Sequence, residues 1–223
     1  MCGRFVRSST VERLAGGFRL KEARLELPPA YNIAPSEEVA IIRNSGGRQL
    51  LTCRWGFVPP AKDSSAGGKT LSLINARAET VATRPAFRDA FLKQRCLVVA
   101  DGFYEWQKEG GRKKPFYVRL RSGRPFGFAG LYSTQVSSAR ETVCTCAIIT
   151  TAANELLEPI HDRMPAIIPG DKEDLWLDPA IQDAGLLRSL LRPYPPDEME
   201  LHEVSPKVNS PGFNSPDAIL PLN

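Results

Sequence analysis

Short runs of β-branched, aliphatic and aromatic residues recur along the chain and predict a protein rich in β-strands. The runs are separated by Gly, Pro, Asn and Ser and cover residues 38–44, 49–58, 70–79, 95–107, 114–122, 124–133 and 141–151. Residues 109–113, EGGRK, are typical of a hairpin loop between two of them. Strands this close together favour a single-domain α+β fold, in which a mostly antiparallel sheet closes toward a barrel and short helices flank it.

Helical patterns are fewer and shorter than the strand-like runs. Residues 8–18 carry Ser9 and Glu12 at the spacing of a capping box, which indicates the start of a helix. Residues 85–94 place Pro85 in a first turn and repeat apolar residues at helical spacing. Similar patterns predict short helices at residues 154–160, 171–177 and 183–191.

The length and composition are those of an ordinary globular protein. The 223 residues are 42% hydrophobic and 24% charged, so the chain can bury a substantial core. We expect one domain over residues 1–223. Residues 62–70, KDSSAGGKT, resemble a flexible insert, and about residues 204–223, rich in Pro, Ser and Asn, are expected to lie as an extended arm over the surface.

The charge balance allows an anionic partner without requiring one, since the formal net charge is +4. A strongly basic tail is absent, so contacts with nucleic acid have to come from arginines placed locally. The N-terminus has no apolar signal region, and no apolar run approaches the roughly 20 residues of a membrane span. We therefore expect a cytoplasmic, nucleoid-associated protein that does not bind membranes, and the compact chain favours a bacterial source.

The five cysteines are scattered along the chain and predict neither a disulfide framework nor a zinc site. They are Cys2, Cys53, Cys96, Cys144 and Cys146. Cys144 and Cys146 are two residues apart in a strand-like run, so their side chains point to one face, and core packing is the favoured interpretation. No metal or other cofactor is predicted.

Cys2 follows the initiating methionine, and its small side chain favours removal of Met1. The mature N-terminus would then carry an amine and a thiol on adjacent carbon atoms. An internal cysteine cannot offer this pair, because its nitrogen is locked in an amide. Cys2 is therefore either a reactive group around which the protein is built or an accident of translation.

Polar side chains occupy positions inside two predicted strands. Asn75, Arg77 and Glu79 share one face of a period-2 strand, and this pattern alone favours a solvated face over the floor of a site. Asp101 and Glu105 lie among aromatic residues, where burial would raise the pKa of a carboxyl group. The second strand is therefore the stronger candidate for acid–base chemistry.

His161 is one of two histidines and lies between a predicted helix and a predicted strand. A single histidine in such a place is more often a packing residue than a catalyst. Each of these polar signals is weak when it is taken alone.

Taken together, the motifs of the chain resemble a known family. The motifs are MCGRF, YNIAPS, RWGFVP, NARAET, PAFR, RCLVVADGFYEW, FAGLY and HDRMPAII. In this order and at these spacings they resemble the SRAP family, named for SOS response-associated peptidases, over essentially the whole chain up to about residue 178. The resemblance implies a protein that binds single-stranded DNA at abasic sites during the response to DNA damage and attaches its N-terminal cysteine covalently to the lesion.

The resemblance also implies which residues act. The positions that match the family's reaction centre are Cys2, Asn75, Glu105 and His161. The positions that match contacts to the DNA backbone are Arg4, Arg77, Arg163 and Thr150. Trp55, Phe57 and Trp106 are candidates to stack on bases, with core packing about equally favoured. After WGFVPP the family usually has an aromatic residue, whereas this chain continues with Ala61 and Lys62, which puts a stacking contact at that position in question.

The chemistry of an abasic site gives an N-terminal cysteine a purpose, because the deoxyribose exists partly as an open-chain aldehyde. A free amine condenses with the aldehyde to a Schiff base, and the neighbouring thiol then closes a five-membered thiazolidine ring. An α-amino group has a reference pKa of about 7.7–8, so a useful neutral fraction exists at neutral pH. The ring also removes the imine through which β-elimination cuts the strand, so it protects the lesion.

The other residues take their roles from this mechanism. Glu105 can hold a proton near neutral pH and pass it to the sugar oxygen or the carbinolamine. His161 can act as a second acid–base group, and Asn75, which does not titrate, can orient the amine or the lesion. The arginines suit bidentate contacts with phosphates, which position a strand without reading its sequence. We expect the protein to act as a monomer.

Other classes of protein fit parts of the sequence. Glutamine amidohydrolases with an N-terminal nucleophile also begin Met-Cys-Gly, but nothing beyond these three residues matches them. A thiol peptidase would use Cys2, Glu105 and His161, and self-cleavage of Met1 by these residues stays open, as does a lyase activity. A DNA-binding module without covalent chemistry would leave the position of Cys2 unexplained.

Overall fold

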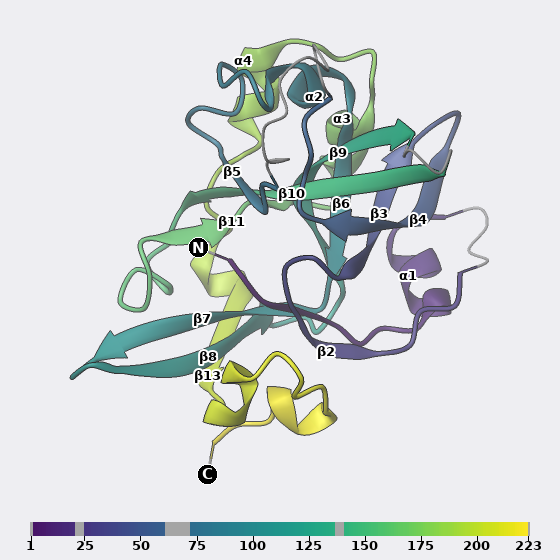
Figure 1. The fold of residues 1–223 in the computed structure, drawn as a ribbon. Helices are drawn as coiled ribbons and strands as arrows, with labels where there is room; N and C mark the ends of the chain where they lie inside the picture. Colours follow the sequence, from purple (N-terminus) through teal and green to yellow (C-terminus); the bar gives the residue numbers. More distant parts are fainter. Residues whose placement is uncertain (1, 21–24, 61–71, 137–140, 223) are drawn as a thin grey trace, which may run out of the picture.

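The computed structural model describes residues 2–20, 25–60, 72–136 and 141–222, and the strands of this part form two sheets (Figure 1). The smaller sheet has five strands in the order β13 (Met199–Glu203), β8 (Arg112–Leu120), β7 (Gly102–Glu109), β1 (Phe5–Arg7) and β2 (Ala30–Ile33). The larger sheet has eight strands. Seven of them follow the order β11 (Arg163–Pro165), β10 (Thr142–Ala152), β4 (Arg48–Trp55), β3 (Glu38–Asn44), β6 (Arg95–Ala100), β9 (Phe126–Val136) and β12 (Ile167–Ile168). The eighth strand, β5 (Asn75–Arg77), pairs with β10.

The larger sheet closes on itself at β10. This strand pairs with β4 on one side and with β9 on the other, which completes the ring β10–β4–β3–β6–β9. Most strand pairs are antiparallel, whereas β4 and β5 run parallel to β10. The predicted α+β fold, with a mostly antiparallel sheet that closes toward a barrel and short flanking helices, is confirmed.

The α-helices of the described residues are short. They are α1 (Val11–Gly17), α2 (Arg88–Lys93), α3 (Glu173–Leu177) and α4 (Ala184–Ser189), and Figure 1 shows α2, α3 and α4 gathered at one end of the larger sheet. The helix predicted at residues 154–160 is wrong, because this segment forms hydrogen-bonded turns. Pro159 has no backbone N–H to continue a helical ladder, which explains why the pattern does not propagate.

Helix α1 is capped by Thr10 and not by Ser9. The Thr10 side chain accepts a hydrogen bond of 3.4 Å from the backbone N–H of Arg13. Ser9 instead donates hydrogen bonds from its backbone N–H and its hydroxyl group to the carboxylate of Asp101. Ser9, which the sequence pattern predicts as the cap, is therefore bound to a residue that is distant in sequence. Helix α2 begins at Arg88, after the predicted first turn.

Two hydrophobic clusters lie on opposite faces of the larger sheet, and alternate residues of one strand enter each of them. In β3, Ala40 and Ile42 pack with residues of the helices, which are Leu14, Phe91 and Trp176. Val39 and Ile41 pack with residues of the smaller sheet, which are Phe5, Phe103 and Val118. The larger sheet is therefore covered by helices on one face and by the smaller sheet on the other.

The cysteines differ in part from the prediction. Cys53 of β4 and Cys144 of β10 form a disulfide, although the sequence pattern predicts none. The pairing follows from the parallel register of β4 and β10, which sets the two residues side by side and which nothing in the local sequence indicates. Cys146 is buried and lies in the same cluster as Cys144, as the shared face predicts.

The C-terminal segment packs along the smaller sheet and is shown in yellow in Figure 1. After the 3₁₀ helix η1 (Pro196–Glu198) and β13, it forms two more short 3₁₀ helices, η2 (Pro206–Asn209) and η3 (Pro216–Ile219), in place of a continuously extended arm. Val208 and Ala218 are buried, and the hydroxyl of Tyr104 donates a hydrogen bond of 3.2 Å to the carbonyl of Ala218. The segment is thus an integral part of this face.

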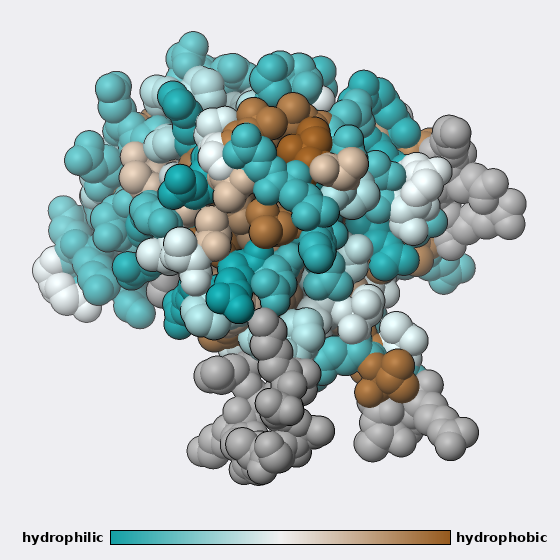
Figure 2. Space-filling model, turned by 90° about the horizontal axis from the view of Figure 1, so that it is seen from above, coloured by the Kyte–Doolittle hydropathy of each residue, from teal (hydrophilic) through white to brown (hydrophobic). Residues whose placement is uncertain are grey.

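The surface near α2 and α4 is mostly hydrophilic, and its hydrophobic areas are small (Figure 2). Leu186 of α4 is among the exposed large hydrophobic residues of the described chain. No helix within the described ranges is long and apolar enough to span a bilayer.

Candidate active site

Cys2 lies buried where the two sheets meet, and its side chain is 0% exposed. It precedes β1, whose Phe5 pairs with Phe103 of β7 and with Ile33 of β2. From the larger sheet, Nδ2 of Asn75 donates a hydrogen bond of 2.9 Å to the carbonyl oxygen of Cys2. The Oδ1 atom of Asn75 is buried and has no hydrogen-bond partner among the described residues, so this amide has an acceptor to offer.

Glu105 of β7 is the carboxyl group beside Cys2. It is buried, and burial raises its pKa to about 7. Burial also raises the pKa of the Cys2 thiol, and the Glu105 carboxylate raises it further, so the two groups lie within electrostatic reach of each other. At neutral pH the thiol therefore keeps its proton, while Glu105 is divided between its acid and its carboxylate form.

His161 lies directly after the turns of residues 154–160, and its side chain is 29% exposed. Its Nδ1 lies 3.0 Å from the backbone nitrogen of Arg163 and 2.9 Å from Oδ1 of Asp162. The N–H of Arg163 favours a proton on Nε2, whereas the Asp162 carboxylate favours a proton on Nδ1. Burial lowers the pKa of His161, and Asp162 opposes this shift. Besides burial, Asp162 also contributes to the raised pKa of Glu105, so it lies within electrostatic reach of both groups.

Arg163 of β11 is held in place by Glu79 and Thr150. Its guanidinium donates two hydrogen bonds to the Glu79 carboxylate, at 2.6 and 3.0 Å, and one of 2.6 Å to the carbonyl oxygen of Thr150. The bonds from Arg163 lower the pKa of Glu79. Thr150 is fully buried and lies in register with Arg77 of β5, whose side chain is exposed.

Arg4 and Trp106 are bound to the C-terminal segment. Arg4 donates hydrogen bonds to Oδ1 of Asn32 at 2.8 Å and to the carbonyl of Val208 at 3.2 Å. Nε1 of Trp106 donates to Oδ1 of Asn209 at 2.7 Å. A hollow of about 410 Å³ lies here, lined by Gly3, Arg4, Trp106, Lys113 and Asn209.

The family model described as SOS response associated peptidase (SRAP) matches residues 1–211. The chain belongs to the SRAP family. Its similarity to the abasic site processing protein YoqW of Bacillus subtilis (strain 168) is 43% identity over 98% of this chain and 99% of the relative. The abasic site processing protein HMCES of Gallus gallus is 30% identical, over 100% of this chain and 78% of that protein.

The SRAP fold is also found in solved structures. A crystal structure of a protein from Bacteroides thetaiotaomicron matches with a TM-score of 0.84 and 27% identity, and the match covers 100% of both chains. The two-sheet arrangement described above is therefore that of a natural family and not a feature of this chain alone.

The structure of this SRAP protein brings most of the predicted site residues to one region. Asn75 contacts Cys2 directly, Glu105 lies within electrostatic reach of Cys2, and His161 is connected to Glu105 through Asp162. Thr150 has no exposed surface to offer to DNA, but it supports Arg163.

The predicted stacking residues are divided. Trp55 and Phe57 are fully buried, so they are core residues without a face for a base. Trp106 is partly exposed and lines the hollow beside Arg4. Ala61 and Lys62, like the predicted insert at residues 62–70, lie outside the described residues.

Two asparagines at this site received no role in the sequence analysis. Asn32 accepts a hydrogen bond from Arg4, and Asn209 accepts one from Trp106. Asn32 belongs to the motif YNIAPS, which is one of the motifs shared with the SRAP family, so the motif could have indicated a role for Asn32. Asn209 and Trp106 are 103 residues apart in sequence, and no local pattern indicates their contact.

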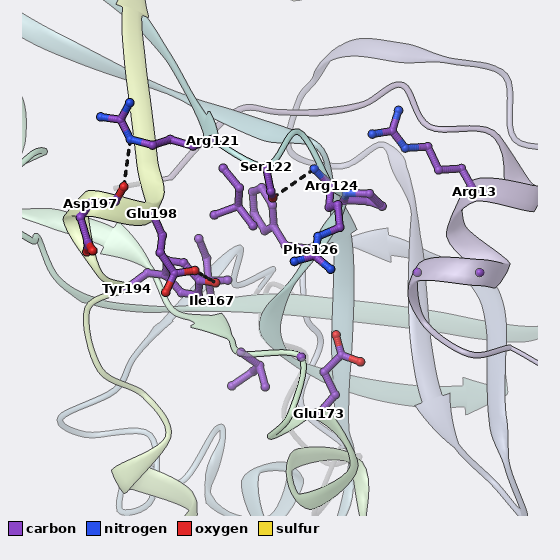
Figure 3. Close-up of a pocket in the computed structure, with 16 residues that line it drawn as sticks. Arg13, Arg121, Ser122, Arg124, Phe126, Ile167, Glu173, Tyr194, Asp197 and Glu198 are labelled. Atoms are coloured by element: carbon purple, nitrogen blue, oxygen red, sulfur yellow. Dashed lines mark hydrogen bonds between the residues drawn. The ribbon is translucent and has the colours of Figure 1, made fainter.

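A separate hollow of about 730 Å³ shares no lining residue with this cluster (Figure 3). Arg13, Arg121 and Arg124 line it together with three carboxylates, which are Glu173, Asp197 and Glu198. Its charges are therefore mixed.

Proposed function

We propose that this SRAP protein binds single-stranded DNA at abasic sites and, once Met1 has been removed, forms a thiazolidine crosslink through Cys2. The crosslink shields the lesion during the response to DNA damage. The names of its relatives, which are abasic site processing proteins, support a reaction at this lesion. The observation that carries the proposal is the burial of Cys2 beside Asn75 and Glu105 at the start of the chain.

The state of the Cys2 thiol favours a reaction that starts at the amine. The nucleophile of a thiol peptidase is the thiolate, and burial raises the pKa of this thiol, which disfavours the thiolate at neutral pH. An α-amino group has a reference pKa of about 7.7–8, so a fraction of it is neutral and nucleophilic at the same pH. The amine is therefore the better first nucleophile, and the crosslink is favoured over peptide hydrolysis.

The reaction proceeds in two balanced steps. The amine attacks the aldehyde carbon of the ring-opened deoxyribose, and loss of one water leaves an imine. The thiol sulfur then adds to the imine carbon while the nitrogen takes up a proton, which closes the ring. The net reaction consumes one amine, one thiol and one aldehyde, releases one water, and involves no change of oxidation state.

Three side chains suit the proton transfers of this reaction. Glu105, with its pKa raised to about 7 by burial, can protonate the departing hydroxyl group and take a proton from the thiol. His161, whose Nδ1 contacts both the backbone N–H of Arg163 and the Asp162 carboxylate, can act as a second acid–base group toward a sugar oxygen. Asn75 holds the carbonyl of Cys2 and can accept a hydrogen bond from the amine at its buried Oδ1.

The arginines around the cluster suit a phosphate backbone. Arg163 already holds a carboxylate in a bidentate arrangement, and a phosphate presents the same acceptor geometry. Arg77 is exposed and lines one hollow with Asn75, and Arg4 lines another with Trp106. The ring of Trp106 can stack on a base while Asn209 holds its Nε1.

Two further activities belong to the same cluster. A lyase activity arises when the imine undergoes β-elimination before the ring closes, so strand cleavage and crosslinking compete. Self-removal of Met1 would make the protein a peptidase acting on its own chain. The intact mass of purified Glu105→Gln tests the second activity, because retention of Met1 by this variant alone would assign the hydrolysis to Glu105.

The experiment that tests the proposal incubates protein of verified mass with a single-stranded oligonucleotide that carries one abasic site. Parallel incubations contain the matched duplex, free glutamine, and casein. We expect a heat-stable adduct on a denaturing gel that forms faster on the single strand, with no release of ammonia from glutamine and no cleavage of casein. Absence of the adduct together with hydrolysis of casein would replace the proposal with the peptidase alternative.

A further inference from the structure

A second hollow, of about 740 Å³, lies beside the reactive cluster and shares Asn75 with it. It is formed by β5 and the turns on either side of it, and its polar lining residues are Ser72, Asn75, Arg77, Thr80, Thr83 and Arg84. Its volume is within the range of about 300–1,000 Å³ in which proteins hold small molecules. A unit the size of a nucleotide therefore fits here.

The charges of this hollow are of one sign. Two guanidinium groups and three hydroxyl groups line it, and none of its lining residues in the described part of the chain is a carboxylate. In contrast, the hollow beside His161 contains Glu109 and Asp162, and the hollow in Figure 3 contains three carboxylates. Within the described residues the carboxylate of Glu79, which lies within electrostatic reach of Arg77, is hydrogen-bonded to Arg163, and Asp89 pairs with Arg88. Arg77 and Arg84 are therefore the groups of this region that can bind an added anion.

The turn that carries Arg84 is rigid. The backbone N–H of Arg84 donates a hydrogen bond of 2.9 Å to the carbonyl of Thr80, and the buried Val81 anchors the turn in the core. The guanidinium of Arg84 lies 5.8 Å from the centre of the Phe87 ring, which supports its orientation. Little conformational freedom of the turn is therefore lost when an anion binds.

Cys2 and the two residues after it connect this hollow with the hollow at Trp106. The carbonyl of Cys2 binds Asn75, which lines the first hollow, and the next two residues, Gly3 and Arg4, line the second. Among residues 2–60 and 72–222, where the structure describes them, no carboxylate lines either hollow. A strand with its lesion at Cys2 therefore lies near two hollows lined by basic residues.

We propose that the hollow at residues 72–84 binds the DNA backbone on one side of the lesion, and that Arg84 contacts the phosphate of a flanking nucleotide there together with Arg77. This inference rests on the proposed function, because it takes Cys2 as the position of the abasic site. It adds Arg84 to the DNA-binding residues and divides the surface into two flanks, one with Arg77 and Arg84 and one with Arg4 and Trp106.

The first test measures the affinity of Arg84→Ala for an undamaged single strand over a range of salt concentrations. Loss of one phosphate contact reduces the slope of log K against log salt by about 0.7 for a single strand, which corresponds to about fourfold weaker binding near 0.15 M salt. The matched control is Arg88→Ala, since Arg88 is exposed, pairs with Asp89 and does not line the hollow. Arg84→Glu should weaken binding further, whereas identical slopes for Arg84→Ala and Arg88→Ala would overturn the proposal.

The second test locates the contact along the strand. Two oligonucleotides carry the abasic site at the 5′ or at the 3′ end, so that each has nucleotides on one flank only. We expect Arg84→Ala to slow crosslinking about fourfold on one of them and to match the wild-type rate on the other. An equal deficit on both would indicate a general electrostatic effect and would contradict a contact confined to one flank.

These measurements separate failure of this inference from failure of the proposed function. If the wild-type protein crosslinks both oligonucleotides and Arg84→Ala does so at the same rates, Arg84 does not bind the strand and the proposed function stands. If the wild-type protein forms no crosslink at all, the proposed function fails. The salt series then still decides whether the hollow binds single-stranded DNA.

Discussion

The two sheets make different contributions to the candidate site. The smaller sheet and the residues that lead into it carry the groups that can react, Cys2 and Glu105, and both are buried with raised pKa values. The larger sheet carries Asn75, Arg77 and Arg163, whose amide and guanidinium groups are hydrogen-bond donors suited to orienting the lesion and holding the backbone. Cys2 and its nearest carboxyl group therefore lie on one sheet and these three positioning residues on the other, so substitutions in the two groups should affect different observables. His161, between β10 and β11, and Trp106 of β7 do not follow this division.

The largest effect is expected from the smaller sheet at Cys2. Cys2→Ala keeps an N-terminal amine but removes the thiol, so an imine can form and a ring cannot. We expect complete loss of the heat-stable adduct, measured on a denaturing gel, while Cys2→Ser leaves a short-lived imine or a weaker oxazolidine. A stable adduct at wild-type yield from Cys2→Ala would show that the sulfur takes no part in the bond.

Glu105→Gln should affect rate and not affinity. General acid–base catalysis contributes about a hundredfold to ten-thousandfold, and amine condensation with an aldehyde proceeds unaided, so we expect about a hundredfold slower crosslinking. The acid form of Glu105 disappears as the pH rises through about 7, so the variant should lose the high-pH limb of the rate profile. Time courses of crosslink formation between pH 5 and 9, on protein whose mass confirms a start at Cys2, measure this difference. Superimposable pH profiles of the two proteins would show that Glu105 has only a structural role.

The buried carboxyl group of Glu105 should also lower the free energy of unfolding above neutral pH. Its pKa is about 4.3 in the unfolded chain and about 7 in the folded protein, so ionisation in the folded state is disfavoured. The penalty is absent below about pH 4, grows up to about pH 7 and reaches about 4 kcal/mol above it. Glu105→Gln should therefore raise the free energy of unfolding at pH 8 and change it little at pH 4.5. Equal denaturation midpoints of the two proteins at pH 8 would contradict this.

The sequence predicts the local parts of this fold well. The run EVAIIRN becomes β3 with the predicted bounds, because its alternate residues enter two different cores. The loop EGGRK joins β7 and β8 as predicted, since Gly110 and Gly111 adopt the positive φ that the turn requires. In both cases the residues that decide the structure lie within the segment itself.

Two of the predictions that fail depend on distant partners, whereas the helix at residues 154–160 fails at Pro159 within the segment itself. Ser9 is bound by Asp101 and so leaves the cap of α1 to Thr10, and Cys53 reaches Cys144 through a strand pairing 91 residues apart. The candidate site also depends on contacts between residues that are distant in sequence. Polar alternation marked Asn75 and Arg77 as one face, whereas the contact of Asn75 with Cys2 requires the assembled sheets. Only the family resemblance pointed to that contact.

The smallest effect is expected from the larger sheet at Arg77. Arg77→Ala removes one exposed guanidinium beside Asn75, so it should weaken binding of undamaged and abasic single strands alike, by about fourfold near 0.15 M salt. Fluorescence anisotropy over a salt series measures this, with Arg88→Ala as the control. If Arg77→Ala weakened only the binding of abasic strands, Arg77 would take part in the reaction at the lesion and would not position the DNA backbone.

The central claim is that Cys2 reacts through both its amine and its thiol, and the adduct itself tests it most directly. Intact mass spectrometry and thiol titration under denaturing conditions are applied to the purified adduct and to the free protein. The account predicts a mass equal to the Cys2-initiated protein plus the oligonucleotide minus one water, with one accessible thiol fewer than in the free protein and no gain in mass after borohydride treatment. An adduct that retains this thiol, or that borohydride reduces, is an imine and would contradict the account.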